Sequence, residues 1–195
     1  TIGISKSNID FFNNSIMNVD KIAWKLKKIE IFSDNLGKEK LINFENNHNE
    51  LFSIIRNQKL FESLIKSLSK DKHFKRINSL KNFNLSDNYN LIINTDFTSP
   101  ITKKYFSRKI LKQYNSSAYT TIIQHEKIVN DIAVQIFTKL GPLAFLPISE
   151  KETSVVYSFY NKKNENINNL IEKYNRKYKI LKIEKINSFE LKSLN

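Results

Sequence analysis

The chain has 195 residues, of which 40% are hydrophobic and 12% aromatic, so it can bury a sizeable core and does not have the composition of a disordered protein. It contains no cysteine, which excludes disulfides, thiolate zinc sites and cysteine nucleophiles and fits a cytoplasmic protein. No apolar run approaches the roughly 20 residues that a membrane-spanning helix needs.

The formal net charge is +13, which would suit a nucleic acid or an anionic membrane face as a partner. The lysines are scattered along the chain, however, and none of the usual signatures of nucleic-acid binding is present. We therefore interpret most of them as solvated surface residues and expect no nucleic-acid partner. The densest basic stretch, 173–185, is a candidate for contact with a membrane surface, and peripheral attachment at the inner membrane is the alternative to a purely cytoplasmic location.

The first predicted elements are a helix and a hairpin. Ser7 can cap a helix whose apolar residues recur at helical spacing. These residues are Ile9, Phe12 and Ile16. Two short strands, 28–32 and 41–45, flank the turn-forming sequence DNLG and are expected to pair as a hairpin.

The next segment predicts a strand-to-helix junction and a buried strand. A short apolar run at 51–55 leads to Asn57, which can cap a helix with one apolar stripe. The stripe consists of Leu60, Phe61, Leu64, Ile65 and Leu68. The sequence LIINTD at 91–96 is nearly all apolar up to its acidic end, which is typical of a parallel strand covered on both faces.

In the second half, the hydrophobic period changes to two. Alternation between 118 and 160 predicts about four antiparallel strands. A helix with Ile167, Leu170, Ile171 and Tyr174 on one face follows, and 180–186 is expected to be a last strand. The pattern as a whole predicts an α+β fold with two interleaved domains.

Few residues carry recognisable chemistry. The three histidines are far apart, and the three glycines are isolated, so there is no phosphate-binding loop. The sequence IFTKLGPLAFLPI at 136–148 predicts a strand, a tight Gly-Pro turn and a second apolar strand ending at proline. Proline withholds a donor from a sheet, so this second strand could line a cavity. A hairpin in a hydrophobic core is the other interpretation.

The segment FTKLGPLAFLPISEKETSVVYSF at 137–159 resembles the FT–GPLA–LP stretch of the FAD-dependent hydroxylases of ubiquinone biosynthesis. These are class A aromatic monooxygenases with the p-hydroxybenzoate hydroxylase fold. Four other segments resemble motifs of that family in the same order: TIGIS at 1–5, IIRN at 54–57, LIINTD at 91–96 and FELKSLN at 189–195. The family's Gly-x-Gly-x-x-Gly and Gly-Asp motifs do not occur, so we expect a fragment that begins inside a longer protein, without the N-terminal dinucleotide-binding motif.

The resemblance implies part of an FAD-binding domain interleaved with a substrate domain, which has an antiparallel or mixed sheet and helices on one side. Residues 1–50 would begin the substrate-domain region. Residues 51–110 would belong to the FAD-binding domain, and 111–195 would form the antiparallel-sheet substrate domain.

The resemblance also implies FAD and NAD(P)H as cofactors and hydroxylation of a polyprenylated phenol ring in ubiquinone biosynthesis. It nominates Asn57 and Asp96 as flavin contacts. The candidate walls of the substrate pocket are Phe137, Leu143, Phe145 and Pro147. No catalytic acid or base and no metal ligand is nominated, because the flavin supplies the difficult chemistry in such enzymes.

Two other functions remain open. The first is a degenerate, non-catalytic flavoprotein-like domain that binds a lipid or a partner in a quinone-synthesis assembly. It is favoured by Phe97, which stands after Asp96 where the family has glycine. The second is a basic nucleic-acid-binding protein, which rests on the charge alone.

Overall fold

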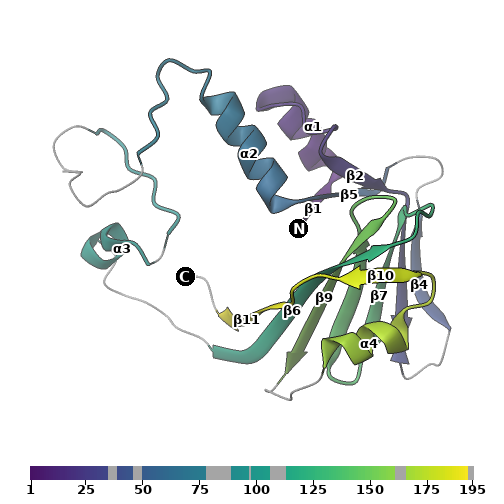
Figure 1. The fold of residues 1–195 in the computed structure, drawn as a ribbon. Coiled ribbons are helices and arrows are strands. Elements are labelled where there is room, and N and C mark those ends of the chain that lie inside the picture. The colour runs from purple at the N-terminus through teal and green to yellow at the C-terminus, as the bar shows by residue number, and fades with distance from the viewer. Residues whose placement is uncertain are drawn as a thin grey trace.

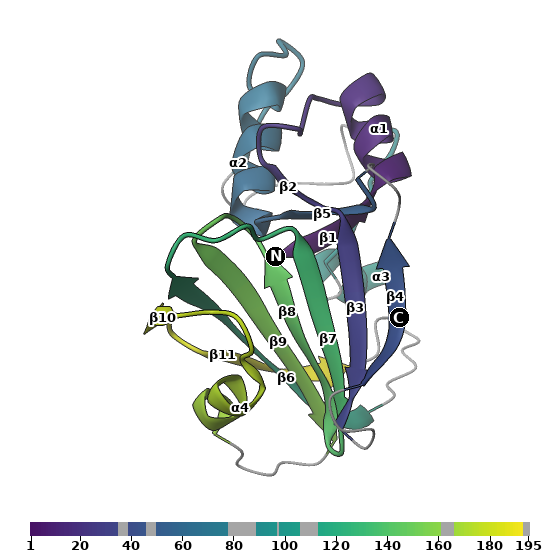
Figure 2. The ribbon, with the colours of Figure 1, turned by 90° about the vertical axis from the view of Figure 1, so that its right-hand side faces the viewer.

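The computed structural model describes residues 1–34, 39–45, 50–77, 89–96, 98–105, 113–160 and 166–192. In these ranges the strands form a small and a large sheet (Figure 1). The small sheet has the antiparallel order β1 (Ile2–Ser5), β5 (Phe52–Ile55), β2 (Ala23–Leu26). Helices α1 (Lys6–Ser15) and α2 (Asn57–Leu68) follow β1 and β5 and lie on the side of the small sheet that points away from the large one (Figure 2).

The large sheet has the order β10 (Ile180–Ile183), β6 (Gln113–His125), β9 (Glu152–Tyr160), β8 (Gly141–Pro147), β7 (Ile132–Thr138), β3 (Lys28–Ser33), β4 (Lys40–Glu45), and β11 (Asn187–Lys192) also pairs with β6. All pairs are antiparallel except β3 with β7, which is parallel. Helix α4 (Ile167–Tyr174) lies against one face, and the short helix α3 (Pro100–Tyr105) lies in the segment between α2 and β6. None of the helices in the described ranges could span a bilayer, because none is both long and apolar enough.

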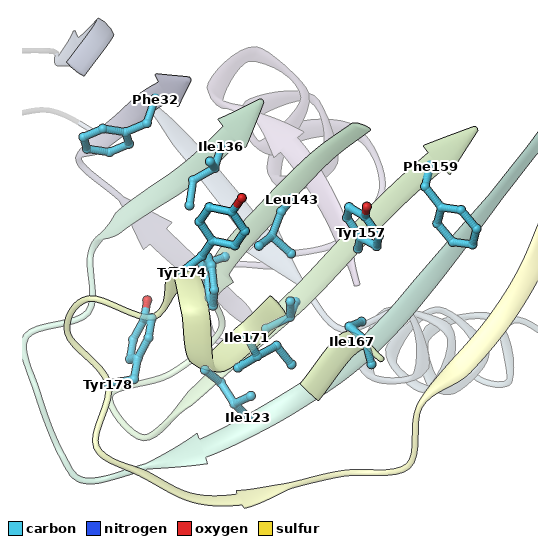
Figure 3. Close-up of a cluster of buried hydrophobic side chains, with 12 residues drawn as sticks. Phe32, Ile123, Ile136, Leu143, Tyr157, Phe159, Ile167, Ile171, Tyr174 and Tyr178 are labelled. Atoms are coloured by element: carbon cyan, nitrogen blue, oxygen red, sulfur yellow. The ribbon is translucent and has the colours of Figure 1, made fainter. Parts of the chain in front are cut away.

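The face of the large sheet under α4, here called the covered face, carries the main hydrophobic core (Figure 3). The helix buries Ile167, Ile171 and Tyr174 there, which recur at helical spacing on one side of α4. The sheet contributes Phe32, Ile123, Ile136, Leu143, Phe145, Val155, Tyr157 and Phe159. These alternate along their strands with residues of the opposite face, here called the open face, because side chains alternate across a sheet.

A second cluster joins the two sheets. Leu26 and Ile54 of the small sheet are buried together with Ala133 of β7, whose side chain lies on the open face. An ion pair between Arg56 Nη2 and Glu152 Oε2, 2.6 Å apart, links the end of β5 to the start of β9. The small sheet therefore packs over one end of the open face and leaves the rest of that face without a second layer in the described ranges.

Most of the predicted elements are confirmed, and so is the α+β fold class. The hairpin of β3 and β4, the four strands β6 to β9 and helix α4 occur where the periodicity placed them. The strand predicted at 180–186 ends at Ile183, and it is not the last one, since β11 follows. Helix α1 is capped by Ser5 rather than Ser7, since Ser5 Oγ accepts a hydrogen bond from the Asn8 backbone N–H (3.4 Å). Helix α2 begins at Asn57, but the cap position is occupied by Arg56 without a side-chain hydrogen bond.

The buried parallel strand predicted at 91–96 is wrong. The segment has no regular secondary structure, and Leu91 and Ile93 are 75% and 80% exposed. A strand of this kind needs paired neighbours and cover on both faces, and no strand in the described ranges pairs with it.

The domain ranges 1–50, 51–110 and 111–195 stay predictions. Residues 1–50 contribute strands to both sheets, since β1 and β2 belong to the small sheet and β3 and β4 to the large one. The chain after residue 113 lies in the large sheet and its helix, as far as it is described.

Candidate functional site

The candidate site is the part of the open face that the small sheet leaves uncovered. Strand register places one row of side chains across β3, β7, β8 and β9 and a second row at the turn between β7 and β8. The first row is Ile31, Gln135, Ala144 and Val156, and the second row begins with Phe137 and Pro142. Apart from Phe137, which is 45% exposed, these residues are half-buried. Register extends the first row to Thr120 and the second to Ser33, so the surface is apolar with small hydroxyl groups at its edges and one amide group, that of Gln135.

Burial along β8 shows why the open face is accessible. Leu143, Phe145 and Pro147 are buried, whereas the alternating positions Pro142 and Ala144 are only half-buried. Leu143 and Phe145 belong to the core under α4. The sheet thus has one side that carries the core under α4 and one side that is only partly packed, as expected where only one face carries a helix.

The four candidate pocket residues are consequently not brought together. Leu143, Phe145 and Pro147 share one face of β8, as alternation predicts, but that face is the covered one. Phe137 lies on the open face, across the sheet from them. Phe145 does line a cavity, which lies at the C-terminal end of α4.

The turn that carries the Gly-Pro sequence is held by its own residues. The Thr138 hydroxyl donates a hydrogen bond to the Gly141 carbonyl oxygen (2.7 Å) and accepts from the Gly141 backbone N–H (3.3 Å). Gly141 has φ = 151°, and a Cβ built there would lie 2.0 Å from the Ser158 carbonyl oxygen. Thr138 and Gly141 are therefore required by the hairpin, whatever the protein binds.

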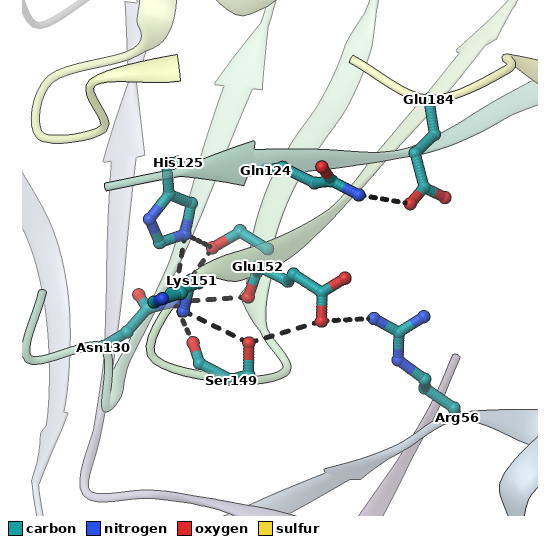
Figure 4. A network of polar contacts seen from close by, with 9 residues as sticks. Arg56, Gln124, His125, Asn130, Ser149, Lys151, Glu152 and Glu184 are labelled. Atoms are coloured by element: carbon teal, nitrogen blue, oxygen red, sulfur yellow. Dashed lines mark hydrogen bonds and ion pairs between the residues drawn. The ribbon is translucent and has the colours of Figure 1, made fainter. Parts of the chain in front are cut away.

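A buried polar network supports the sheet at the other end (Figure 4). The Asn130 amide donates to the Ser149 carbonyl oxygen (2.8 Å) and to Thr153 Oγ1 (3.0 Å), and its own oxygen accepts from the Tyr178 hydroxyl (3.2 Å). His125 Nδ1 lies 2.8 Å from the Glu126 carbonyl oxygen, which can only accept, so Nδ1 carries the proton. Nε2 is then free to accept from the Thr153 hydroxyl at 3.0 Å.

The geometry of this network indicates a structural role. It ties together the end of β6, the turn between β8 and β9, and the segment after α4, and its members Asn130 and Thr153 are almost fully buried. Burial also raises the pKa of Tyr178 to about 12, so its phenol remains a neutral donor. We assign no catalytic acid or base to this cluster.

The two candidate flavin contacts lie on the surface, in different segments of the fold. Asn57 is exposed at the first turn of α2. Asp96 is exposed in the segment before α3, and its carboxylate accepts hydrogen bonds from the backbone N–H (2.8 Å) and hydroxyl (2.7 Å) of Thr98. Those bonds hold the pKa of Asp96 below its usual value and occupy one carboxylate oxygen.

The described residues do not fit the pyrophosphate of FAD. Such a group normally lies on a glycine-rich turn at a helix N-terminus. Of the three glycines, Gly3 faces the Phe52 ring and Gly141 faces the Ser158 backbone, with no room for a ligand at either position, and Gly37 lies outside the described residues. We therefore derive no chemical step through FAD for this chain.

Sequence reasoning missed Gln135, Ala144 and Val156 as site residues. Their alternation with buried neighbours is visible in the sequence, so membership of one face could be predicted. Periodicity cannot say which face a helix covers, because both faces of these strands are apolar enough to be buried.

Comparison with known proteins supports the fold alone. The chain is similar to the crystal structure of tetracycline destructase Tet(51), with a TM-score of 0.51 and 12% sequence identity over 99% of this chain and 60% of that one. The chain spans less than two thirds of the length of that protein.

No family model and no curated protein matches the sequence. The assignment to the ubiquinone-biosynthesis hydroxylases is therefore wrong, since the structural likeness is to a different enzyme at low identity. The FT–GPLA–LP stretch, on which that assignment mainly rested, is explained by the local structure. Thr138 and Gly141 build the turn between β7 and β8, and the residues that follow alternate into the core.

Proposed function

We propose that the chain forms the substrate-binding sheet of a flavin-dependent monooxygenase that acts on an apolar ring compound. The observation that carries the proposal is the open face, a half-exposed apolar surface on a sheet whose other side carries the main hydrophobic core. The likeness to tetracycline destructase Tet(51) supports it, since that fold belongs to a protein named for its action on a compound built of rings.

The open face is suited to a flat apolar ligand. A ring lying across Ile31, Ala144 and Val156 would remove apolar surface from water on both partners, at about 25 cal/mol for each Å² buried. Phe137 stands at the edge of the row and can stack against a ring. The Gln135 amide offers a donor and an acceptor for a ring substituent.

The cofactors are part of the same proposal. FAD reduced by NAD(P)H would activate O₂, which supplies the oxygen atom transferred to the ring. The contribution that we assign to this chain is to bind and orient the ring and to exclude water from one side of it.

The test is oxygen transfer. The chain is incubated with excess FAD, NADPH, O₂ and a panel of uncharged ring compounds, and mass spectrometry follows each compound. Gain of one oxygen atom that requires FAD, NADPH and O₂ together is the expected result. Ring compounds that bind to the open face but gain no oxygen would contradict the enzymatic function.

That second outcome would support the other candidate, a non-catalytic ligand-binding domain. One observation favours this candidate. Asp96 is hydrogen-bonded to Thr98, and the described glycines face protein atoms, so neither forms a binding site for the phosphates of a dinucleotide. A titration that follows flavin fluorescence tests the cofactor site. We expect the chain to bind FAD only weakly, so the oxygen-transfer test uses FAD at concentrations that saturate this titration, and micromolar binding would show that the cofactor site has been misplaced.

A further inference from the structure

A pocket lies on the covered face, at the C-terminal end of α4. It has a volume of about 200 Å³. Its floor is Phe32, Val134 and Phe145, from three neighbouring strands, and its walls are Tyr174 and Tyr178, both labelled in Figure 3. The aromatic residues among these are buried, so the hollow is a gap in the core that opens at the surface.

The size of this pocket limits its occupant. A dry cavity of about 150 Å³ is known to accommodate benzene, and drug-sized ligands occupy roughly 300 Å³ or more. A pocket of about 200 Å³ therefore fits one substituted six-membered ring. Aromatic side chains in the floor and walls favour an aromatic ring, through offset-stacked or edge-to-face contacts.

The charged side chains around the pocket determine which substituent a bound ring should carry. Glu30 is the acidic residue among those that line it, and its carboxylate already binds Lys40 Nζ (2.7 Å) and Lys28 Nζ (3.4 Å). Burial opposes ionisation of Glu30, but these two lysines outweigh it and hold its pKa below the usual value. The negative charge of Glu30 is therefore offset by two lysines of the protein, and it does not determine the charge of a ligand.

Two cations remain on the rim. The Arg176 guanidinium lies over the Phe32 ring (4.7 Å), and Lys177 Nζ lies over the Tyr178 ring (4.9 Å). Neither makes an ion pair within 4.0 Å with any carboxylate of the described residues. An arginine held in place above an aromatic ring presents a rigid planar fork, which suits a carboxylate.

We propose that this pocket binds a monocyclic aromatic carboxylate, with the ring on Phe145 and Val134 and the carboxylate between Arg176 and Lys177. The site is distinct from the open face. Along β7 and β8, the pocket residues Val134 and Phe145 alternate with Gln135 and Ala144 of the other side, so the sheet separates the two ligands. Binding here requires neither FAD nor the ring substrate, and it holds whether or not the proposed function does.

Benzoate is the probe, and isothermal titration calorimetry on the 195-residue chain gives its affinity. Benzylamine, which has the same ring and the opposite charge, is expected not to bind. The double variant Arg176→Gln/Lys177→Gln should weaken benzoate binding by about tenfold or more, because it removes charge-assisted hydrogen bonds. The matched control Lys179→Gln, two residues further along and outside the pocket, should bind benzoate like the wild type.

A filling variant tests the position of the ring. Val134→Phe places extra carbon atoms in the half-buried floor and should abolish benzoate binding while the melting temperature is kept. The proposal is overturned if benzoate shows no saturable binding, if benzylamine binds as tightly, or if the Arg176→Gln/Lys177→Gln variant retains wild-type affinity. Should Val134→Phe unfold, the charge variants and the two probes decide the question alone.

Discussion

At the scale of single residues, Gly141 is the position that the turn between β7 and β8 depends on most. Its φ of 151° is uncommon for other residues, and a Cβ would meet the Ser158 carbonyl oxygen at 2.0 Å. We expect Gly141→Ala to lower the free energy of unfolding by roughly 2 kcal/mol or more, as measured by urea denaturation. Lys139→Ala, an exposed change in the same turn, should stay within about 0.5 kcal/mol of wild type. Equal stability of the two variants would show that the turn can accommodate a side chain at position 141.

Tyr178 gives the protein a pH dependence in the alkaline range. Burial raises its pKa to about 12, whereas an exposed tyrosine titrates near 10. The unfolded chain therefore loses this proton first, so the stabilisation is complete below about pH 10 and is lost as the pH rises towards about 12.

Tyr178→Phe removes this titration. The free energy of unfolding of the variant should fall less steeply with pH between about 10 and about 12 than that of the wild type, even though the variant also lacks the hydrogen bond to Asn130. Chemical denaturation at several pH values measures both slopes. Identical slopes would mean that the phenol is accessible to water in the folded state.

At the scale of elements, strong periodicity was enough to predict α4, the strands β6 to β9 and the β3–β4 hairpin. It failed at 91–96, where an apolar run does not pair with any described strand, because burial depends on neighbours that lie elsewhere in the chain. The candidate site was predicted only in part. Alternation placed Leu143, Phe145 and Pro147 on one face correctly, but the position of α4, which makes that face the core, is a tertiary property.

The role of Phe145 can be tested directly. Its side chain is 2% exposed and stacks near Tyr178, with 6.0 Å between the ring centroids. Phe145→Asp would bury a carboxylate among apolar groups without a partner, which is costly enough to prevent folding. We expect an insoluble product or a variant without a cooperative thermal transition. A soluble Phe145→Asp variant with the wild-type melting temperature would place this residue outside the core.

At the scale of the whole molecule, the charge of +13 is the most conspicuous property. That charge is the excess of 32 Lys and Arg over 19 Asp and Glu residues, some of which are paired with one another, as at Lys25 with Glu50 and at Lys28 and Lys40 with Glu30. We predict that any binding to DNA or RNA is weak, lacks sequence preference and falls steeply with salt, since only phosphate contacts would contribute. Fluorescence anisotropy with unrelated oligonucleotides at two salt concentrations measures this. Tight, sequence-selective binding at physiological salt would contradict it.

One side of the large sheet carries the core, and we propose that the other side binds an apolar ring. The most direct measurement is the affinity of Nile red, an uncharged fluorescent ring compound, for two variants that each exchange an exposed phenylalanine for aspartate. Phe137 lies on the open face and is 45% exposed, whereas Phe11 lies on α1 and is 57% exposed. We expect that both variants fold, that Phe137→Asp weakens binding by about tenfold or more, and that Phe11→Asp binds like the wild type. Wild-type affinity in a folded Phe137→Asp variant would contradict the assignment of the open face as the binding surface.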